Sequence, residues 1–168
     1  MKNIEFKSEL RDIELARATC HLLRARRVGI LLQTDEYVVV PEGRLKRRTE
    51  RDETGTHERT EWIWYQRADR VSARESLWTR LDDAQVAARW PALDRTISKV
   101  IVKRREFWFA ENIRIHLDSV AGLGNYFELE GIVGVTDDES ETRLKVDTLI
   151  EKFRPALGEF VSGSYSDL

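Results

Sequence analysis

Residues 112–120 read NIRIHLDSV and residues 126–133 read YFELEGIV, and both segments alternate charged with apolar side chains. A period of two is typical of a β-strand whose faces meet different surroundings. The charged face carries Arg114, His116 and Asp118 in the first segment and Glu128 and Glu130 in the second. Glycines at positions 122 and 124 predict a turn between the two segments. The two segments therefore predict a pair of neighbouring strands with one charged face.

The same alternation extends to the N-terminal segment. Residues 2–11 place Asn3, Glu5, Lys7 and Glu9 on one face of a predicted strand. Further strands are expected at 29–40, 44–50, 61–67, 74–81 and 99–109. Two of these strands carry basic residues at every second position: Arg44, Lys46 and Arg48 in the strand at 44–50, and Lys103 and Arg105 in the strand at 99–109. Strands therefore dominate the predicted structure.

Three helices are expected between and after these strands. The first follows Asp12 as N-cap and covers residues 13–26, with an apolar stripe that includes Cys20 and Leu22. The second starts with a capping box at residues 82–85 and ends at the Trp90-Pro91 pair. The third starts with Thr136 and Glu139 as a capping box and ends near Phe153. With the strands, these helices predict an α+β fold.

Composition limits the classes of function. The chain has 168 residues, 41% of them hydrophobic and 35% charged, with a net charge of −2. This length predicts a single domain over residues 1–168. The near-zero net charge argues against a basic nucleic-acid-binding domain, and no apolar run is long enough to be a signal peptide or to cross a bilayer. We therefore expect a cytoplasmic protein with no nucleic-acid or membrane partner, and a homodimer remains open.

The charged strand faces allow two interpretations. They are either the solvated faces of a half-buried sheet or the inward faces of a closed barrel. A solvated face tolerates any polar residue, yet here lysine and arginine dominate some strands and paired carboxylates dominate others. In a closed barrel, the basic strands would neutralise a polyphosphate and the carboxylate strands would hold its metal. This segregation favours the closed antiparallel barrel.

These residues resemble a known family, the triphosphate tunnel metalloenzymes or CYTH superfamily, which includes class IV adenylyl cyclases and thiamine triphosphatases. Family members open with a Glu-x-Glu-x-Lys strand, which Asn3 to Lys7 resemble. Further similar segments are Asp35 to Arg48, Tyr65 to Arg67, Val102 to Glu106, Asn112 to Asp118, Gly124 to Glu130, and Gly163 to Leu168. The resemblance covers nearly the whole chain. It implies an eight-stranded antiparallel tunnel with flanking helices, a divalent cation and a triphosphate-bearing substrate.

The resemblance also implies roles for individual residues. The expected metal ligands are Glu5, Asp118, Glu128 and Glu130, and oxygen ligands of this kind suit Mg²⁺ or Mn²⁺. The expected phosphate-binding residues are Lys7, Arg44, Lys46, Arg67, Lys103, Arg105 and Arg114, of which Lys7 and Arg114 are the expected catalytic residues. Asn3 departs from the family pattern, because an amide stands where the first glutamate is expected, and one metal is favoured over two.

Two reactions fit the predicted site equally well. In a class IV cyclase, the ribose 3′-hydroxyl of ATP attacks the α-phosphorus, giving cyclic AMP and pyrophosphate; in a triphosphatase, water attacks the terminal phosphorus. The first and last segments of the chain most resemble the class IV cyclase-like branch. His116 and Tyr65 are candidates for proton transfer, and a polar-network role for His116 is equally open.

Non-catalytic functions remain as alternatives. The chain could bind a nucleotide or polyphosphate without turnover, or the basic run at 44–48 could contact RNA phosphates. The carboxylates at Glu5, Glu128 and Glu130 argue against the RNA surface, which would gain nothing from them.

Overall fold

The computed structural model describes residues 2–67, 73–134 and 138–168, and within them antiparallel strands form one continuous sheet. In chain order the elements are β1 (Lys2–Leu10), α1 (Ile13–Leu22), β2 (Arg26–Val38), β3 (Arg44–Asp52), β4 (Glu58–Arg67), β5 (Arg74–Leu81), α2 (Asp83–Arg89), β6 (Ile97–Ala110), β7 (Ile113–Val120), β8 (Gly124–Val133), α3 (Glu139–Phe153), the 3₁₀ turn η1 (Arg154–Ala156), β9 (Leu157–Phe160) and the 3₁₀ turn η2 (Tyr165–Asp167). None of the described helices is long and apolar enough to span a bilayer.

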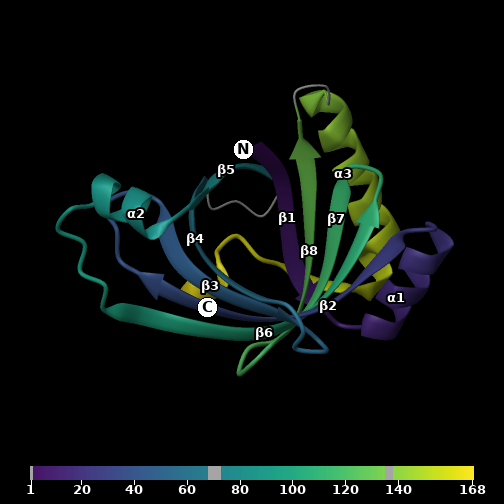
Figure 1. Cartoon of the computed structure of the whole chain (residues 1–168). Coiled ribbons are helices and arrows are strands. Elements are labelled where there is room, and N and C mark those ends of the chain that lie inside the picture. Colours follow the sequence, from purple (N-terminus) through teal and green to yellow (C-terminus); the bar gives the residue numbers. More distant parts are fainter. Residues whose placement is uncertain (1, 68–72, 135–137) are drawn as a thin grey trace.

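The strands close into a barrel. Their order is β5-β4-β3-β2-β6-β7-β8-β1, and β5 also pairs with β1 (Figure 1). The first half of β1 pairs with β5, with Asn3 opposite Ser76, whereas the second half pairs with β9, with Ser8 opposite Phe160. The predicted eight-stranded antiparallel barrel is confirmed, and β9 is an additional strand outside it that the sequence pattern did not predict.

The main hydrophobic core lies outside the barrel, between its wall and two helices. α1 and α3 cover the side of the barrel formed by β7 and β8 (Figure 1). The apolar side chains of β1, β7 and β8 that face them are Ile4, Phe6, Ile113, Ile115, Leu117, Phe127 and Leu129, all at most 2% exposed. Burial of each such side chain contributes roughly 1.5–3 kcal/mol. The apolar half of each alternating strand thus stabilises the fold and leaves the charged half facing inward.

A glycine allows α3 to lie close to β8. A β-carbon at Gly131 would come within 2.7 Å of Thr142 and 2.9 Å of Val146 on the helix. Real β-carbons do not approach other atoms so closely, so a larger residue at 131 would displace the helix from the barrel wall.

The first helix is shorter than predicted. α1 ends at Leu22, and Arg24 takes a left-handed conformation with φ of 54°. This conformation is incompatible with helix continuation, so the chain turns and β2 begins at Arg26. The prediction of helix to Arg26 and of Leu22 in its apolar stripe was therefore wrong, since Leu22 is 84% exposed. Cys20 is buried as expected, and burial raises the pKa of its thiol to about 12.

The other helix signals have different outcomes. The capping box of α2 is present between Asp82 and Gln85, and Trp90 is its C-cap, as predicted. α3 uses the side chain of Asp138 as N-cap. The predicted cap at Thr136 lies outside the described residues.

The C-terminal segment closes one end of the barrel. After β9 the chain returns across the barrel (Figure 1). Tyr165, in η2, lines the cavity and is 2% exposed. The Tyr165 hydroxyl donates to Asp118 Oδ2 at 2.9 Å, and the Lys7 amine lies 3.7 Å from the centre of its ring. The barrel interior is thus a cavity with a floor, and the C-terminal segment forms that floor.

Candidate active site

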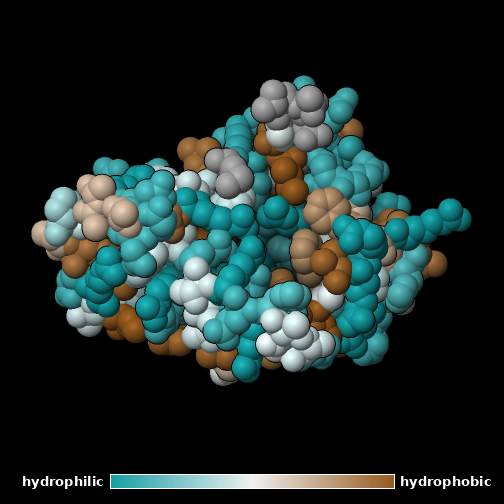
Figure 2. Space-filling view, viewed as in Figure 1, coloured by the Kyte–Doolittle hydropathy of each residue, from teal (hydrophilic) through white to brown (hydrophobic). Residues whose placement is uncertain are grey.

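The interior of the barrel is a charged cavity of about 390 Å³. Figure 2 shows a hollow bordered mainly by hydrophilic residues. Among the described residues, nine lysines and arginines and five glutamates line it: Lys7, Arg26, Lys46, Arg48, Arg59, Arg80, Lys103, Arg105 and Arg114, with Glu5, Glu50, Glu61, Glu128 and Glu130. The cations that line the cavity therefore outnumber the glutamates that line it.

Strand register places these side chains in rows across neighbouring strands. Glu5 on β1 lies opposite Glu130 on β8, which in turn lies opposite Arg114 on β7. One step deeper, Lys7 lies opposite Glu128, which lies opposite His116. Side chains two apart in a strand point to the same face, so a single alternation pattern supplies both rows.

Arg105 anchors the deep part of one wall. Its guanidinium donates to both carboxylate oxygens of Asp118, at 2.7 and 2.6 Å, and to Glu128 Oε2 at 2.5 Å. Burial raises the pKa of Asp118, but the adjacent Arg105 and Lys103 outweigh that effect and hold it below its usual value. Asp118 is therefore a charged partner that fixes Arg105 in place.

A second buried carboxylate lies on β2, the strand next to β6. Asp35 on β2 is fully buried and accepts from Lys46 Nζ at 2.9 Å and from two nitrogens of Arg48, at 2.6 and 2.8 Å. Burial raises its pKa, yet the cations of β3 bring it well below the usual value. Two cations converge on one carboxylate, so positive charge remains available to a ligand.

Lys103 lies between these two groups. Its amine is 3.6 Å from Asp118 and 3.9 Å from Asp35, and the side chain is 2% exposed. Burial, followed by the repulsion of Arg105, lowers the pKa of Lys103 to about 7, although Asp118 raises it. A bound anion would favour the charged form of this amine.

A group of possible metal ligands lies on the adjoining wall. His116, Glu128 and Glu130 each offer one ligand atom, and these atoms lie within 4.8 Å of one another. Glu5 lines the same cavity and faces Glu130 in the strand register. Carboxylate oxygens with one imidazole nitrogen are a donor set that divalent cations accept. These residues fit a divalent cation.

The predicted site residues fall into three groups in the structure. Those that line the cavity are Glu5, Lys7, Lys46, Lys103, Arg105, Arg114, Glu128 and Glu130. Two described residues do not line the cavity: Asp118 is fully buried, and Arg44 donates to Asp167 at 2.8 Å. The side chain of Arg67 lies outside the described part of the chain.

Asn3 also lines the cavity. Its side-chain amide meets the indole N–H of Trp78 at 3.0 Å, with the amide oxygen as acceptor. The amide that replaces the expected glutamate is therefore held by a neighbouring strand.

Sequence reasoning did not assign several residues of this site. Arg59 forms an ion pair with Glu50 Oε1 at 2.9 Å, and Arg80 forms one with Glu61 Oε2 at 2.7 Å, which gives a ladder of ion pairs along β3, β4 and β5. Asp35, Arg48 and Arg26 were also unassigned. The signal was present, because Arg59 and Glu61 continue the alternation of Ile63 and Tyr65 along β4.

Comparison with known proteins identifies the family. Residues 1–165 match the family model described as CYTH domain. The chain belongs to the CYTH domain family. A search of curated proteins found no match to this CYTH chain.

Solved structures share the fold of this CYTH chain. A protein of Pyrococcus horikoshii OT3 superimposes with a TM-score of 0.69 at 18% identity, covering 99% of this chain and 98% of the other. An adenylate cyclase candidate from Vibrio parahaemolyticus gives 0.66 at 17% identity, with coverage of 98% and 95%. A Hippeastrum adenylyl cyclase candidate with a dominant triphosphatase activity gives 0.54 at 14% identity, with coverage of 97% and 92%. At such identities the likeness concerns the fold.

Proposed function

We propose that this CYTH domain is a metal-dependent enzyme that acts on a substrate bearing a triphosphate. The observation that carries the proposal is the closed-ended cavity, in which lysines and arginines outnumber the carboxylates that line it. A small anion with several negative charges would satisfy these cations in a way that a neutral ligand could not.

The chain's own residues divide the binding task between the walls. Lys46, Arg48 and Lys103 would bind phosphate oxygens at the deep end, where Asp35 positions them. Lys7 and Arg114 lie beside Glu128 and Glu130, so they would contact the phosphate nearest the metal. A divalent cation held by Glu5, Glu128 and Glu130 would neutralise and orient the phosphate oxygens. Positioning and charge neutralisation are the main requirements of phosphoryl transfer.

For the reaction, we propose conversion of ATP into cyclic AMP and pyrophosphate, with hydrolysis of a triphosphate as the second candidate. Similarity to the Vibrio adenylate cyclase candidate supports the first, and similarity to the Hippeastrum protein, with its dominant triphosphatase activity, supports the second. The same cavity serves either reaction, because both need a bound and neutralised triphosphate.

Product analysis tests both reactions. Purified protein is incubated with Mg²⁺ or Mn²⁺ and, separately, with ATP, inorganic tripolyphosphate and thiamine triphosphate. We expect cyclic AMP and pyrophosphate from ATP, and release of orthophosphate would assign the triphosphatase instead. Glu130→Gln should reduce either activity by about 10²-fold or more, since it removes a negative charge from the group of possible metal ligands.

The assay has a control variant and a result that would contradict the proposal. Glu53→Gln, at an exposed position in the loop between β3 and β4, should leave the rate unchanged. No turnover of any substrate by folded protein that still binds tripolyphosphate would leave a binding module and overturn the enzymatic proposal.

A further inference from the structure

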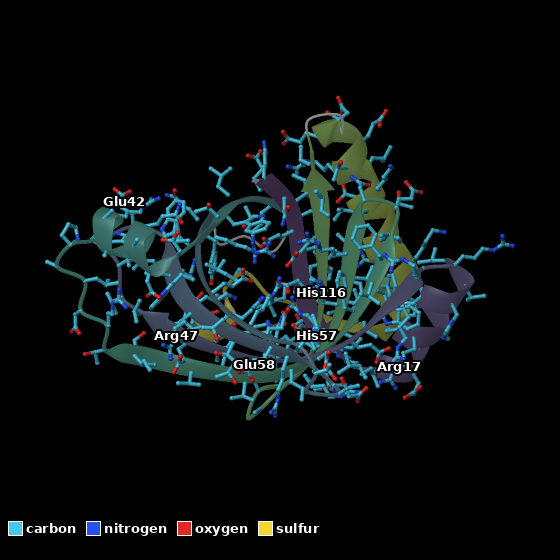
Figure 3. The ribbon with its side chains drawn as sticks, in the orientation of Figure 1. Arg17, Glu42, Arg47, His57, Glu58 and His116 are labelled. Atoms are coloured by element: carbon cyan, nitrogen blue, oxygen red, sulfur yellow. The ribbon has the colours of Figure 1, made fainter. Side chains whose placement is uncertain are left out.

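His116 points into the cavity from β7 (Figure 3) and is 3% exposed. The ring of Phe107 packs against the imidazole with centroids 5.2 Å apart, which restricts its orientation. Its Nδ1 atom has no hydrogen-bond partner. The nearest carboxylate oxygens are Glu128 Oε2 at 3.6 Å and Glu130 Oε1 at 3.8 Å, both beyond hydrogen-bond length.

A buried polar atom without a partner is unusual, because it has lost its water without gaining a hydrogen bond. Here the atom is aimed at two carboxylates with a gap between them. Ligand atoms lie about 2.0–2.1 Å from a bound Mg²⁺, so small side-chain movements would bring all three atoms onto a common centre for a cation of similar size. A cation in this gap would satisfy the nitrogen and both oxygens.

The two carboxylates also form ion pairs with the cavity wall, and a bound cation would share them with these side chains. Glu128 already contacts Lys7 and Arg105, and Glu130 contacts Arg114 at 3.1 Å. Asp118, the β7 carboxylate that the sequence suggested as a ligand, has both oxygens occupied by Arg105 and one also by Tyr165. On β7, His116 is therefore the better placed ligand.

We propose that His116 Nδ1, together with one oxygen each of Glu128 and Glu130, directly binds the divalent cation, and that this mixed set selects Mn²⁺ over Mg²⁺. The proposal rests on the proposed function for the presence of a cation. Mg²⁺ prefers oxygen ligands and retains its waters, whereas imidazole binds first-row transition metals more strongly. Mn²⁺ accepts both donor types, so the nitrogen ligand should favour it.

The test observes the ligand rather than the reaction. Mn²⁺ is bound to the protein without nucleotide, and electron spin echo modulation is recorded to detect a coordinated ¹⁴N nucleus. The wild type should show histidine ¹⁴N modulation, and His116→Gln should lose it together with about tenfold or more of the Mn²⁺ affinity. Mg²⁺ affinity, measured by competition, should change less than Mn²⁺ affinity.

The chain supplies a matched control. His57→Gln changes an exposed histidine in the loop between β3 and β4, so it should retain both the modulation and the affinity. If His116→Gln fails to fold, wild-type protein labelled with ¹⁵N-histidine replaces it, and the ¹⁴N signal should give way to a ¹⁵N coupling. Bound Mn²⁺ without nitrogen coupling, coupling that survives in His116→Gln, or no Mn²⁺ binding would each overturn the proposal.

This outcome is separable from that of the proposed function. Nitrogen coupling in a protein that turns over no triphosphate would support the metal site and refute the enzyme. Turnover with Mn²⁺ bound only through oxygen would support the enzyme and refute the role of His116.

Discussion

At the scale of single residues, the cavity depends on buried carboxylates that hold cations in place. Asp35 and Asp118 are both fully buried, and each contacts more than one lysine or arginine. Such pairs cost free energy to desolvate, and they are held where geometry and additional hydrogen bonds compensate. The positions of the cations are therefore fixed before any ligand arrives.

The lowered pKa of Lys103 leads to a prediction about protons. Because burial lowers it from 10.5 to about 7, the unfolded chain holds more protons between these values, and this residue makes the free energy of unfolding rise with pH there. A bound triphosphate should raise the pKa again. At pH 8 we therefore expect tripolyphosphate binding to be coupled to proton uptake by Lys103.

Calorimetry in buffers of different ionisation enthalpy measures this uptake. Lys103→Met serves as the reference, because it retains the length of the side chain but has no proton to gain. Equal uptake by the wild type and the variant would show that Lys103 does not titrate on binding.

The sequence predicted part of the site at this scale. Spacing two identified Lys7, Lys103, Arg105 and the Glu128–Glu130 pair, since the alternation of a strand determines which side chains share a face. It could not show that Arg105 binds both oxygens of Asp118, or that Asp35 pairs with the cations of β3, because both contacts depend on distances between strands. Nor could it give the direction of His116 Nδ1.

At the scale of elements, β3 carries an arginine on each of its two faces. Arg48 faces the cavity and pairs with Asp35, whereas Arg47 is about half exposed and pairs with Glu36 on the outer surface (Figure 3). If the basic run at 44–48 bound RNA, the outward-facing Arg47 would make the contact. The two arginines therefore form a matched pair for experiment.

Arg48→Gln should weaken tripolyphosphate binding by about tenfold or more, equivalent to about 1.4 kcal/mol, because it removes a cation from the cavity. Arg47→Gln should leave it unchanged and cost at most about 1 kcal/mol of stability, as exposed ion pairs contribute little. Isothermal calorimetry and urea denaturation measure the two quantities.

The double variant Asp35→Asn/Arg48→Gln provides the control for folding, because it removes one charge of each sign from the buried pair. Loss of RNA affinity in Arg47→Gln, with tripolyphosphate binding intact in Arg48→Gln, would instead favour the RNA interpretation.

At the scale of the whole molecule, the barrel is apolar outside on one side and charged inside. The apolar cluster against α1 and α3 is extensive, whereas the cluster beside α2 consists of Val38, Leu45, Trp62 and Val86 with partly buried neighbours. The closed barrel was predictable, since segregated charges suit an interior. The ninth strand and the C-terminal floor were not, because their short segments lack a clear periodic pattern.

This asymmetry predicts unequal local stability. Backbone amides of β7 and β8 should exchange hydrogen more slowly than those of β3 and β4, because fewer buried apolar contacts hold β3 and β4 in place. Native-state hydrogen exchange followed by mass spectrometry measures both. Tripolyphosphate should slow exchange in β3 more than in β8, and uniform protection of all strands would contradict the expectation.

The external position of the core also bears on how such a protein can diverge. Because the largest apolar cluster lies between the barrel wall and the helices, charged residues inside the cavity can be exchanged with little effect on that cluster, provided that each buried cation keeps a carboxylate. Mutational drift could therefore change the ligand while the architecture persists. Superposition on the Pyrococcus horikoshii protein at 18% identity and a TM-score of 0.69 agrees with such tolerance.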